Sequence, residues 1–149
     1  MNKKVSLVRC ELVKEKSITY EFNQEISSSE TAAKIVKDLI GNSDREKFVV
    51  LFLDTRYKII GLEIVAVGQI DQVAIHPREV FKAAIISNSK AIILAHNHPS
   101  GDSTPSQDDI ALTKRMMQAG EILAIEILDH IVVGDNVTSL RETTSLWIW

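Results

Sequence analysis

Two histidines separated by one residue, His96 and His98, are the side chains best suited to chemistry in this sequence. In an extended segment, residues two apart project to the same side of the chain, so both imidazole rings can face one ion. A pair of this kind is more often a hydrogen-bonded pair of histidines than a metal site. The residues that follow the pair therefore decide how it is interpreted.

Ser106 and Asp109 lie three residues apart, a spacing that places both side chains on one face of a helix. From there Asp109 can reach back toward the imidazoles and complete a set of two histidines and one aspartate. Three protein ligands with a fourth position open to water is the arrangement of catalytic zinc, whereas structural zinc usually has four ligands. Asp108 is the alternative ligand, and the spacing from Ser106 favours Asp109. Cys10 is the only cysteine, so a cysteine-rich metal site within one chain is excluded.

Hydrophobic patterns predict the strands that must position these residues. Alternating apolar and polar residues indicate half-buried strands, and short continuous apolar runs indicate strands covered on both faces. The run that ends just before His96 is of the second kind, so the histidine pair begins where a central strand ends. The expected strands are one or two in residues 5–20, one each in 48–53, 58–67, 91–95 and 125–133, and one or two edge strands in 137–149.

Two helices are expected upstream of the histidines. Ser27 and Glu30 fit a capping box at the start of the first helix, and Gly41 ends it. Pro77 fits the first turn of the second helix because its missing N–H would have no partner there, and Asn88 ends that helix.

A further helix is expected after the loop at residues 98–105, and it runs to about Leu123. Thr104 is the expected cap, because Pro105 then takes the first helical position and Gln107 completes a capping box. This helix carries Ser106 and Asp109 toward the histidines.

Length and composition limit the class of protein. The 149 residues suit one α/β domain, a mixed sheet flanked by helices that can fold without disulfides or a structural metal. No apolar stretch could span a bilayer, and charged residues interrupt the apolar residues near the N-terminus, so we expect a cytoplasmic protein without a signal peptide. The net charge is −3 and the Lys and Arg residues are scattered, which does not indicate nucleic-acid binding.

The string AHNHPSGDSTPSQDD, residues 95–109, resembles the JAMM metalloprotease signature, in which two histidines, a serine and an aspartate recur at these spacings. Residues 76–79 and 129–130 are similar to motifs of the bacterial RadC branch of that family, and the resemblance covers about residues 48–134. It implies the JAMM/MPN architecture, which is cytidine deaminase-like.

The resemblance also implies an activity, the hydrolysis of peptide or isopeptide bonds, often at a ubiquitin-like tail. One Zn²⁺ per chain would be held by His96, His98 and Asp109, and Ser106 would hydrogen-bond the developing oxyanion. A glutamate on an upstream strand would accept the proton of the attacking water, and Glu63 holds the matching position. A carboxylate inside an apolar run is costly to bury unpaired, so Glu63 either serves the site or points outward to solvent.

An alternative is a non-catalytic, metal-bearing module that binds a protein or DNA partner, since the RadC group carries a DNA-repair label. Longer members have a helix-hairpin-helix region that we expect to be absent here, which weakens a DNA role. A base deaminase is excluded because it needs a His-x-Glu and a Pro-Cys-x-x-Cys pattern, and this sequence lacks that pair of motifs. The sequence determines neither the substrate nor the oligomeric state.

The remaining distinctive side chains receive structural interpretations. Asp129 and His130 are expected to be hydrogen-bonded strand residues near the site. Trp147 and Trp149 are expected to cover the sheet edge in preference to forming an oligomer contact, because single aromatic residues at chain ends usually dock on their own domain.

Overall fold

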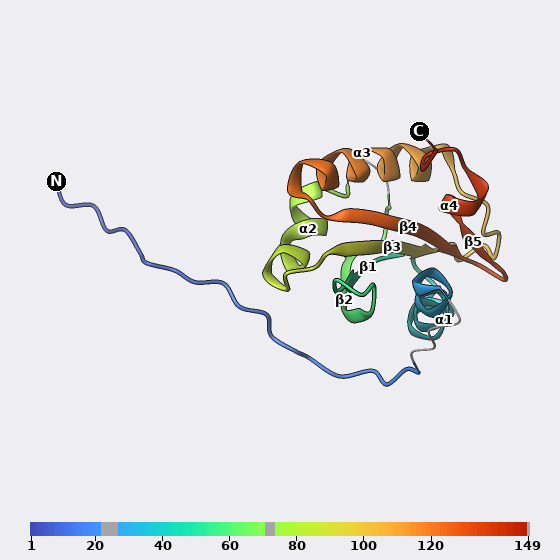
Figure 1. The fold of residues 1–149 in the computed structure, drawn as a ribbon, viewed down its shortest axis with the longest axis horizontal. Helices are drawn as coiled ribbons and strands as arrows, with labels where there is room; N and C mark the ends of the chain where they lie inside the picture. The colour runs from blue at the N-terminus through green and yellow to red at the C-terminus, as the bar shows by residue number, and fades with distance from the viewer. Residues whose placement is uncertain (22–26, 71–73, 149) are drawn as a thin grey trace.

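The computed structural model describes residues 1–21, 27–70 and 74–148. The helices and strands of these residues are, in chain order, α1 (Ser28–Ile40), β1 (Lys47–Leu53), β2 (Ile59–Val67), α2 (Pro77–Ile86), β3 (Ala91–Asn97), α3 (Gln107–Leu123), β4 (Glu126–Val133), β5 (Val137–Ser139) and α4 (Leu140–Thr143). The strands form one mixed sheet in the order β2-β1-β3-β4-β5 (Figure 1). The expected α/β class, a mixed sheet flanked by helices, is confirmed.

Strand β3 is the central strand, and all seven of its residues are buried. It pairs antiparallel with β1 and parallel with β4. The predicted central strand is therefore confirmed, and it continues to Asn97, so His96 lies inside the strand rather than after it.

Helices cover both faces of this sheet (Figure 1). Helix α1 packs on one face, and α2 and α3 lie together over the other. Even-numbered residues of β1 and β3 belong to the apolar cluster under α2 and α3, whereas odd-numbered residues belong to the cluster under α1. Because successive side chains of a strand alternate faces, His96 falls on the α3 side. Within the described ranges, no helix has both the length and the apolar character needed to cross a membrane.

The first two helices begin as the sequence predicts. Ser27 caps α1 in a capping box with Glu30, and Gly41 is its C-cap. Pro77 occupies the first position of α2, and that helix ends at Ile86 with Ser87 as its C-cap, one residue before the predicted Asn88.

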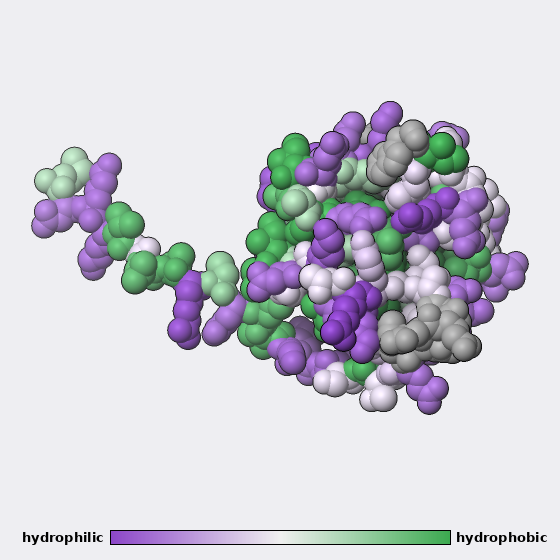
Figure 2. Space-filling model, viewed as in Figure 1, coloured by the Kyte–Doolittle hydropathy of each residue, from purple (hydrophilic) through white to green (hydrophobic). Residues whose placement is uncertain are grey.

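The prediction of one or two strands in residues 5–20 is wrong. Residues 1–19 are exposed and form neither helix nor strand, and the segment extends away from the folded body with apolar side chains uncovered (Figures 1 and 2). Charged residues break the alternation, so a strand here would have no continuous apolar face to bury. Tyr20 marks where the chain reaches the domain, because its hydroxyl donates to the Ile59 carbonyl at 2.5 Å.

The C-terminal residues add one short edge strand, β5, and then the short helix α4. Trp147 docks on the sheet, because its indole Nε1–H donates to the Ile127 carbonyl at 2.9 Å and its ring packs against the core. Trp149, for which the same docking was expected, lies outside the described residues.

Candidate metal centre

The imidazole rings of His96 and His98 meet at the C-terminal end of β3. Their Nε2 atoms are 3.0 Å apart. The backbone N–H of His98 donates to the Val133 carbonyl at 2.8 Å, so the chain stays alongside β4 for one residue beyond the strand. This extended backbone projects both rings to one side, as the two-residue spacing predicts. His96 is fully buried, whereas His98 is partly exposed.

Asp109, in the first turn of α3, completes the group. Its Oδ1 lies 3.1 Å from His96 Nε2, and its Oδ2 lies 3.3 Å from His98 Nε2. Burial alone would raise the pKa of the Asp109 carboxyl, but His96 and the Ser106 N–H hold that pKa below its usual value. The neighbouring Asp108 is exposed, so of the two aspartates it is Asp109 that faces the histidines.

A capping box at the start of α3 fixes the position of Asp109. Ser106 Oγ accepts the Asp109 N–H at 3.0 Å, and Asp109 Oδ2 accepts the Ser106 N–H at 2.8 Å. The prediction that Thr104 caps the helix and that Pro105 is its first residue is therefore wrong by two residues. Two capping patterns overlap in the sequence and the later one forms, while the Thr104 N–H bonds to Asp102 Oδ1 in the preceding turn.

Each of the two histidines uses its second ring nitrogen in a hydrogen bond. His98 Nδ1 lies 2.7 Å from the Asp102 carbonyl oxygen, and His96 Nδ1 lies 2.8 Å from His130 Nε2. The rings of His96 and His130 both pack against Phe48. His130, expected to be structural, thus contacts the site directly. Burial and the neighbouring His96 lower the pKa of His130 well below its ordinary value.

The three side chains lie close enough together to share one ion. The two Nε2 atoms are 3.0 Å apart, and the two oxygens of Asp109 lie 3.1 Å from His96 Nε2 and 3.3 Å from His98 Nε2 respectively. One ligand atom from each residue can be taken so that all three lie within 4.8 Å of one another. Among the residues that the structure describes, these three form the group that could hold a metal ion. Two imidazoles and a carboxylate are ligand types that zinc accepts, so the side chains present fit the metal.

Glu63 does not join this group. It lies on the edge strand β2, and β1 separates that strand from β3. Two strand spacings, about 10 Å, therefore separate the backbone of β2 from the backbone of β3, which carries His96. Burial raises the pKa of the Glu63 carboxyl, while Lys82 and Glu79 of α2 act on this pKa in opposite directions. Both neighbours belong to α2, and neither is one of the three residues that could hold the metal. They do not test the role predicted for Glu63 at the metal, which stays a prediction.

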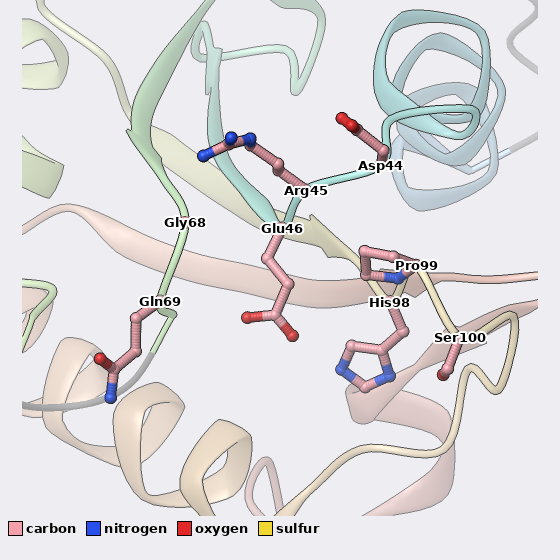
Figure 3. Close-up of a pocket in the computed structure, with 8 residues that line it drawn as sticks. All are labelled: Asp44, Arg45, Glu46, Gly68, Gln69, His98, Pro99 and Ser100. Atoms are coloured by element: carbon pink, nitrogen blue, oxygen red, sulfur yellow. The ribbon is translucent and has the colours of Figure 1, made fainter.

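A different glutamate, Glu46, faces a pocket beside His98. The pocket has a volume of about 610 Å³ and is lined by residues 44–46 just before β1, residues 68–69 just after β2 and residues 98–100 just after β3. In Figure 3 the Glu46 carboxylate points into this pocket, between Gln69 and the His98 ring. The structure thus places in the pocket beside His98 a carboxylate that the sequence interpretation missed.

Asn97, the residue between the two histidines, holds the backbone on both sides of Glu46. Its Oδ1 accepts the Lys47 N–H at 2.7 Å, and its Nδ2 donates to the Arg45 carbonyl at 2.9 Å. Asn97 is 1% exposed, so these bonds are shielded from water. The Glu46 carboxylate is held as well, because its Oε2 accepts the Ile70 N–H at 3.3 Å. The buried side-chain amide of Asn97 therefore links the backbone around Glu46 to β3 by hydrogen bonds.

Comparisons with known proteins point to one family. A family model described as RadC-like JAB domain matches residues 26–145. A UPF0758 protein of Desulforamulus reducens is 45% identical over 117 residues, 78% of this chain and 52% of the relative. A UPF0758 protein of Alkaliphilus metalliredigens is 42% identical over 142 residues, 94% of this chain and 61% of the relative. The chain thus spans between half and three fifths of these relatives.

Proposed function

The chain belongs to the RadC-like JAB domain family, and from this membership and the site geometry we propose that it is a zinc-dependent hydrolase of peptide or isopeptide bonds. The observation that carries the proposal is the convergence of two imidazoles and one carboxylate, whose ligand atoms all lie within 4.8 Å of one another. A hydrolytic zinc site needs three protein ligands and one open position, and this set supplies three.

His96, His98 and Asp109 are the proposed ligands. The two imidazoles present Nε2 atoms, and the carboxylate presents an oxygen to each of them. When bound, zinc would lower the pKa of a water molecule to about 7 and polarise the scissile carbonyl. The partly exposed face of His98 borders the pocket, which gives a substrate access to the ion from that side.

Glu46 is the proposed proton acceptor. A general base must come within hydrogen-bond reach of the proton that it removes. The Glu46 carboxylate lines the same pocket as His98 and is held by the Ile70 N–H, whereas Glu63 lies two strands from the histidines. Glu63, the acceptor expected from the sequence, is the second candidate for this role.

Ser106 is the proposed donor to the developing oxyanion. Its Oγ accepts the Asp109 N–H, so its hydroxyl hydrogen is still available for another acceptor. The residue is exposed at the start of α3, next to a metal ligand. Removal of one such donor typically lowers kcat by about 10²–10³-fold.

The proposed substrate is a protein or peptide chain, including one that ends in a ubiquitin-like tail. The alternative is a metal-bearing module that binds a protein or DNA partner and cleaves nothing. Both share the metal centre, so the first experiment tests the metal and the second separates the two functions.

The metal is tested by elemental analysis of purified wild type beside His96→Ala and His76→Ala. His76 precedes α2, away from the metal group, so it is a matched control for the loss of one histidine. We expect about one zinc per chain in wild type and in His76→Ala, and a large loss in His96→Ala. Equal zinc in all three proteins would end the proposal.

The activity is tested on a library of peptides and isopeptides with zinc-loaded wild type, Glu46→Gln and Glu63→Gln. The two variants make the same chemical change at the two candidate positions. We expect Glu46→Gln to lose at least about 10²-fold in rate and Glu63→Gln to stay near wild type. The reverse order would move the acceptor role to Glu63. Zinc-loaded wild type that cleaves no member of the library would favour the binding module.

A further inference from the structure

A chain of buried hydrogen bonds runs behind the metal group and joins two of its members. His96 Nδ1 lies 2.8 Å from His130 Nε2, and His130 Nδ1 lies 2.5 Å from Thr113 Oγ1. Thr113 Oγ1 lies in turn 2.6 Å from the backbone carbonyl of Asp109. His96, His130 and Thr113 are each 0% exposed, so no water competes for these bonds.

The last member of this chain, the Asp109 carbonyl, determines which group donates and which accepts in every hydrogen bond of the chain. A carbonyl oxygen can only accept, so the Thr113 hydroxyl must donate its one hydrogen to the Asp109 carbonyl. The Thr113 oxygen is then left as an acceptor, and His130 Nδ1 must carry a hydrogen to donate to it.

The same reasoning passes through His130 to His96. The His130 ring is fully buried between a hydroxyl and another imidazole, an environment that keeps it uncharged, so with Nδ1 hydrogenated its Nε2 bears only a lone pair. His96 Nδ1 must therefore donate to it. The hydrogen of an uncharged His96 thus resides on Nδ1, and its Nε2 lone pair faces Asp109 and His98.

We propose that Thr113 and His130 are positioning residues that hold His96 in the tautomer able to bind a metal through Nε2. The hydroxyl of Thr113 sets this arrangement through two hydrogen bonds, Thr113 to His130 and His130 to His96, without contacting the His96 ring itself. Because the carbonyl at the end of the chain belongs to Asp109, the same bonds also link the strand ligand to the helix ligand. This inference rests on the proposed metal centre, which the tests below check separately.

The directions of the bonds are tested on metal-free wild type by ¹⁵N NMR of the imidazole nitrogens near pH 8. We expect a hydrogen on Nδ1 of both His96 and His130, and a bare Nε2 on His130. A hydrogen on His130 Nε2, or none on His96 Nδ1, would overturn the inference. This readout does not require zinc, so it still decides the question if wild type proves unable to bind the metal, an outcome that would remove the proposed function alone.

The consequence for the metal is tested with Thr113→Val and Thr113→Ser, a pair that differs in the hydroxyl. Valine has the shape of threonine but cannot accept from His130, which frees that ring to carry its hydrogen on Nε2 and shifts the His96 hydrogen toward the metal-facing nitrogen. Changes of partners behind ligand histidines typically cost about 10–100-fold in metal affinity. We expect zinc affinity at least about tenfold weaker for Thr113→Val and within about threefold of wild type for Thr113→Ser.

Zinc affinity is measured by competition with a chromophoric chelator, and circular dichroism of the metal-free proteins checks that each variant is folded. Thr113→Val with unchanged zinc affinity and an unchanged His96 ¹⁵N pattern would contradict the inference. An equal loss of affinity in Thr113→Ser would also contradict it, because a role in packing rather than the hydroxyl would then explain the effect. If Thr113→Val does not fold, the wild-type NMR pattern and the affinity of Thr113→Ser decide.

Discussion

A fully buried imidazole at position 130 makes this fold sensitive to acid. His130 is 0% exposed, and burial together with His96 lowers its pKa well below the ordinary value of 6.5. The unfolded chain takes up a proton on this residue below about pH 6.5, whereas the native state does not. The unfolded state then binds more protons, so the free energy of unfolding falls as the pH falls.

The metal-free protein should therefore lose stability between pH 6.5 and pH 5. One titrating group can contribute a slope of at most about 1.4 kcal/mol per pH unit, which is the upper limit for the part due to His130. Urea unfolding at pH 7.5, 6 and 5, with chelator present, measures the free energy of unfolding. His130→Gln should show a shallower dependence on pH than wild type, since glutamine does not titrate. Parallel pH profiles for the two proteins would show that His130 is not responsible.

Helices α1 and α3 both begin with a capping box, and the capping box of α3 contains a residue of the candidate metal centre. Ser27 and Glu30 form a capping box at the start of α1, and Ser106 and Asp109 form one at the start of α3. In α1 the box only satisfies backbone groups at the helix end. In α3 it also turns the Asp109 carboxylate toward His96 and His98, so helix capping and the proposed metal binding use the same side chain.

Ser27→Ala and Ser106→Ala should have similar effects on stability and different effects on activity. Loss of an N-cap serine typically costs about 1 kcal/mol, so both variants should unfold at a slightly lower urea concentration. Only Ser106→Ala should reduce hydrolysis, by about 10²-fold if its hydroxyl donates to the oxyanion. Unfolding curves and initial rates on a cleaved library peptide provide the measurements. Equal activity of both variants would leave Ser106 with a capping role.

At the scale of the whole molecule, the stable body is the sheet with a helical layer on each face. The two apolar clusters described above lie on opposite faces of β1 and β3 and are built from residues between Ala32 and Val133. The segment before Tyr20 is exposed and contributes to neither cluster.

Removal of residues 1–18 should leave the domain as stable as before. Substitutions and losses at exposed positions usually change the free energy of unfolding by no more than about 0.5 kcal/mol. Urea unfolding of the shortened chain beside the full chain measures this, and zinc content should also be equal. A loss of several kcal/mol would show that the segment packs on the domain in solution.

Local patterns in the sequence predicted much of the fold and the candidate ligands. His96, His98 and Asp109 are close in the chain, and the periods of strand and helix alone bring their side chains to one place. Capping at Ser27 and the buried central strand follow from equally local rules. The strand predicted in residues 5–20 failed because alternation shows what a segment could bury, but not whether a neighbouring strand is there to pair with it.

Other features depended on contacts between distant residues. Glu46 follows two charged residues in the sequence, and nothing local separates it from them. The bonds of Asn97 to the backbone on either side of it help to place it beside the histidine strand. His130 was expected near the site as a hydrogen-bonded strand residue, but its bond to His96 exists only because β4 pairs with β3 and sets its ring behind His96. The sequence thus determined most of the elements and the candidate ligand set, because these depend largely on backbone periodicity. The tertiary structure alone showed that Glu46 lines a pocket with His98 and which bonds hold the candidate ligands, because hydrogen bonds between distant segments form only once the sheet is assembled.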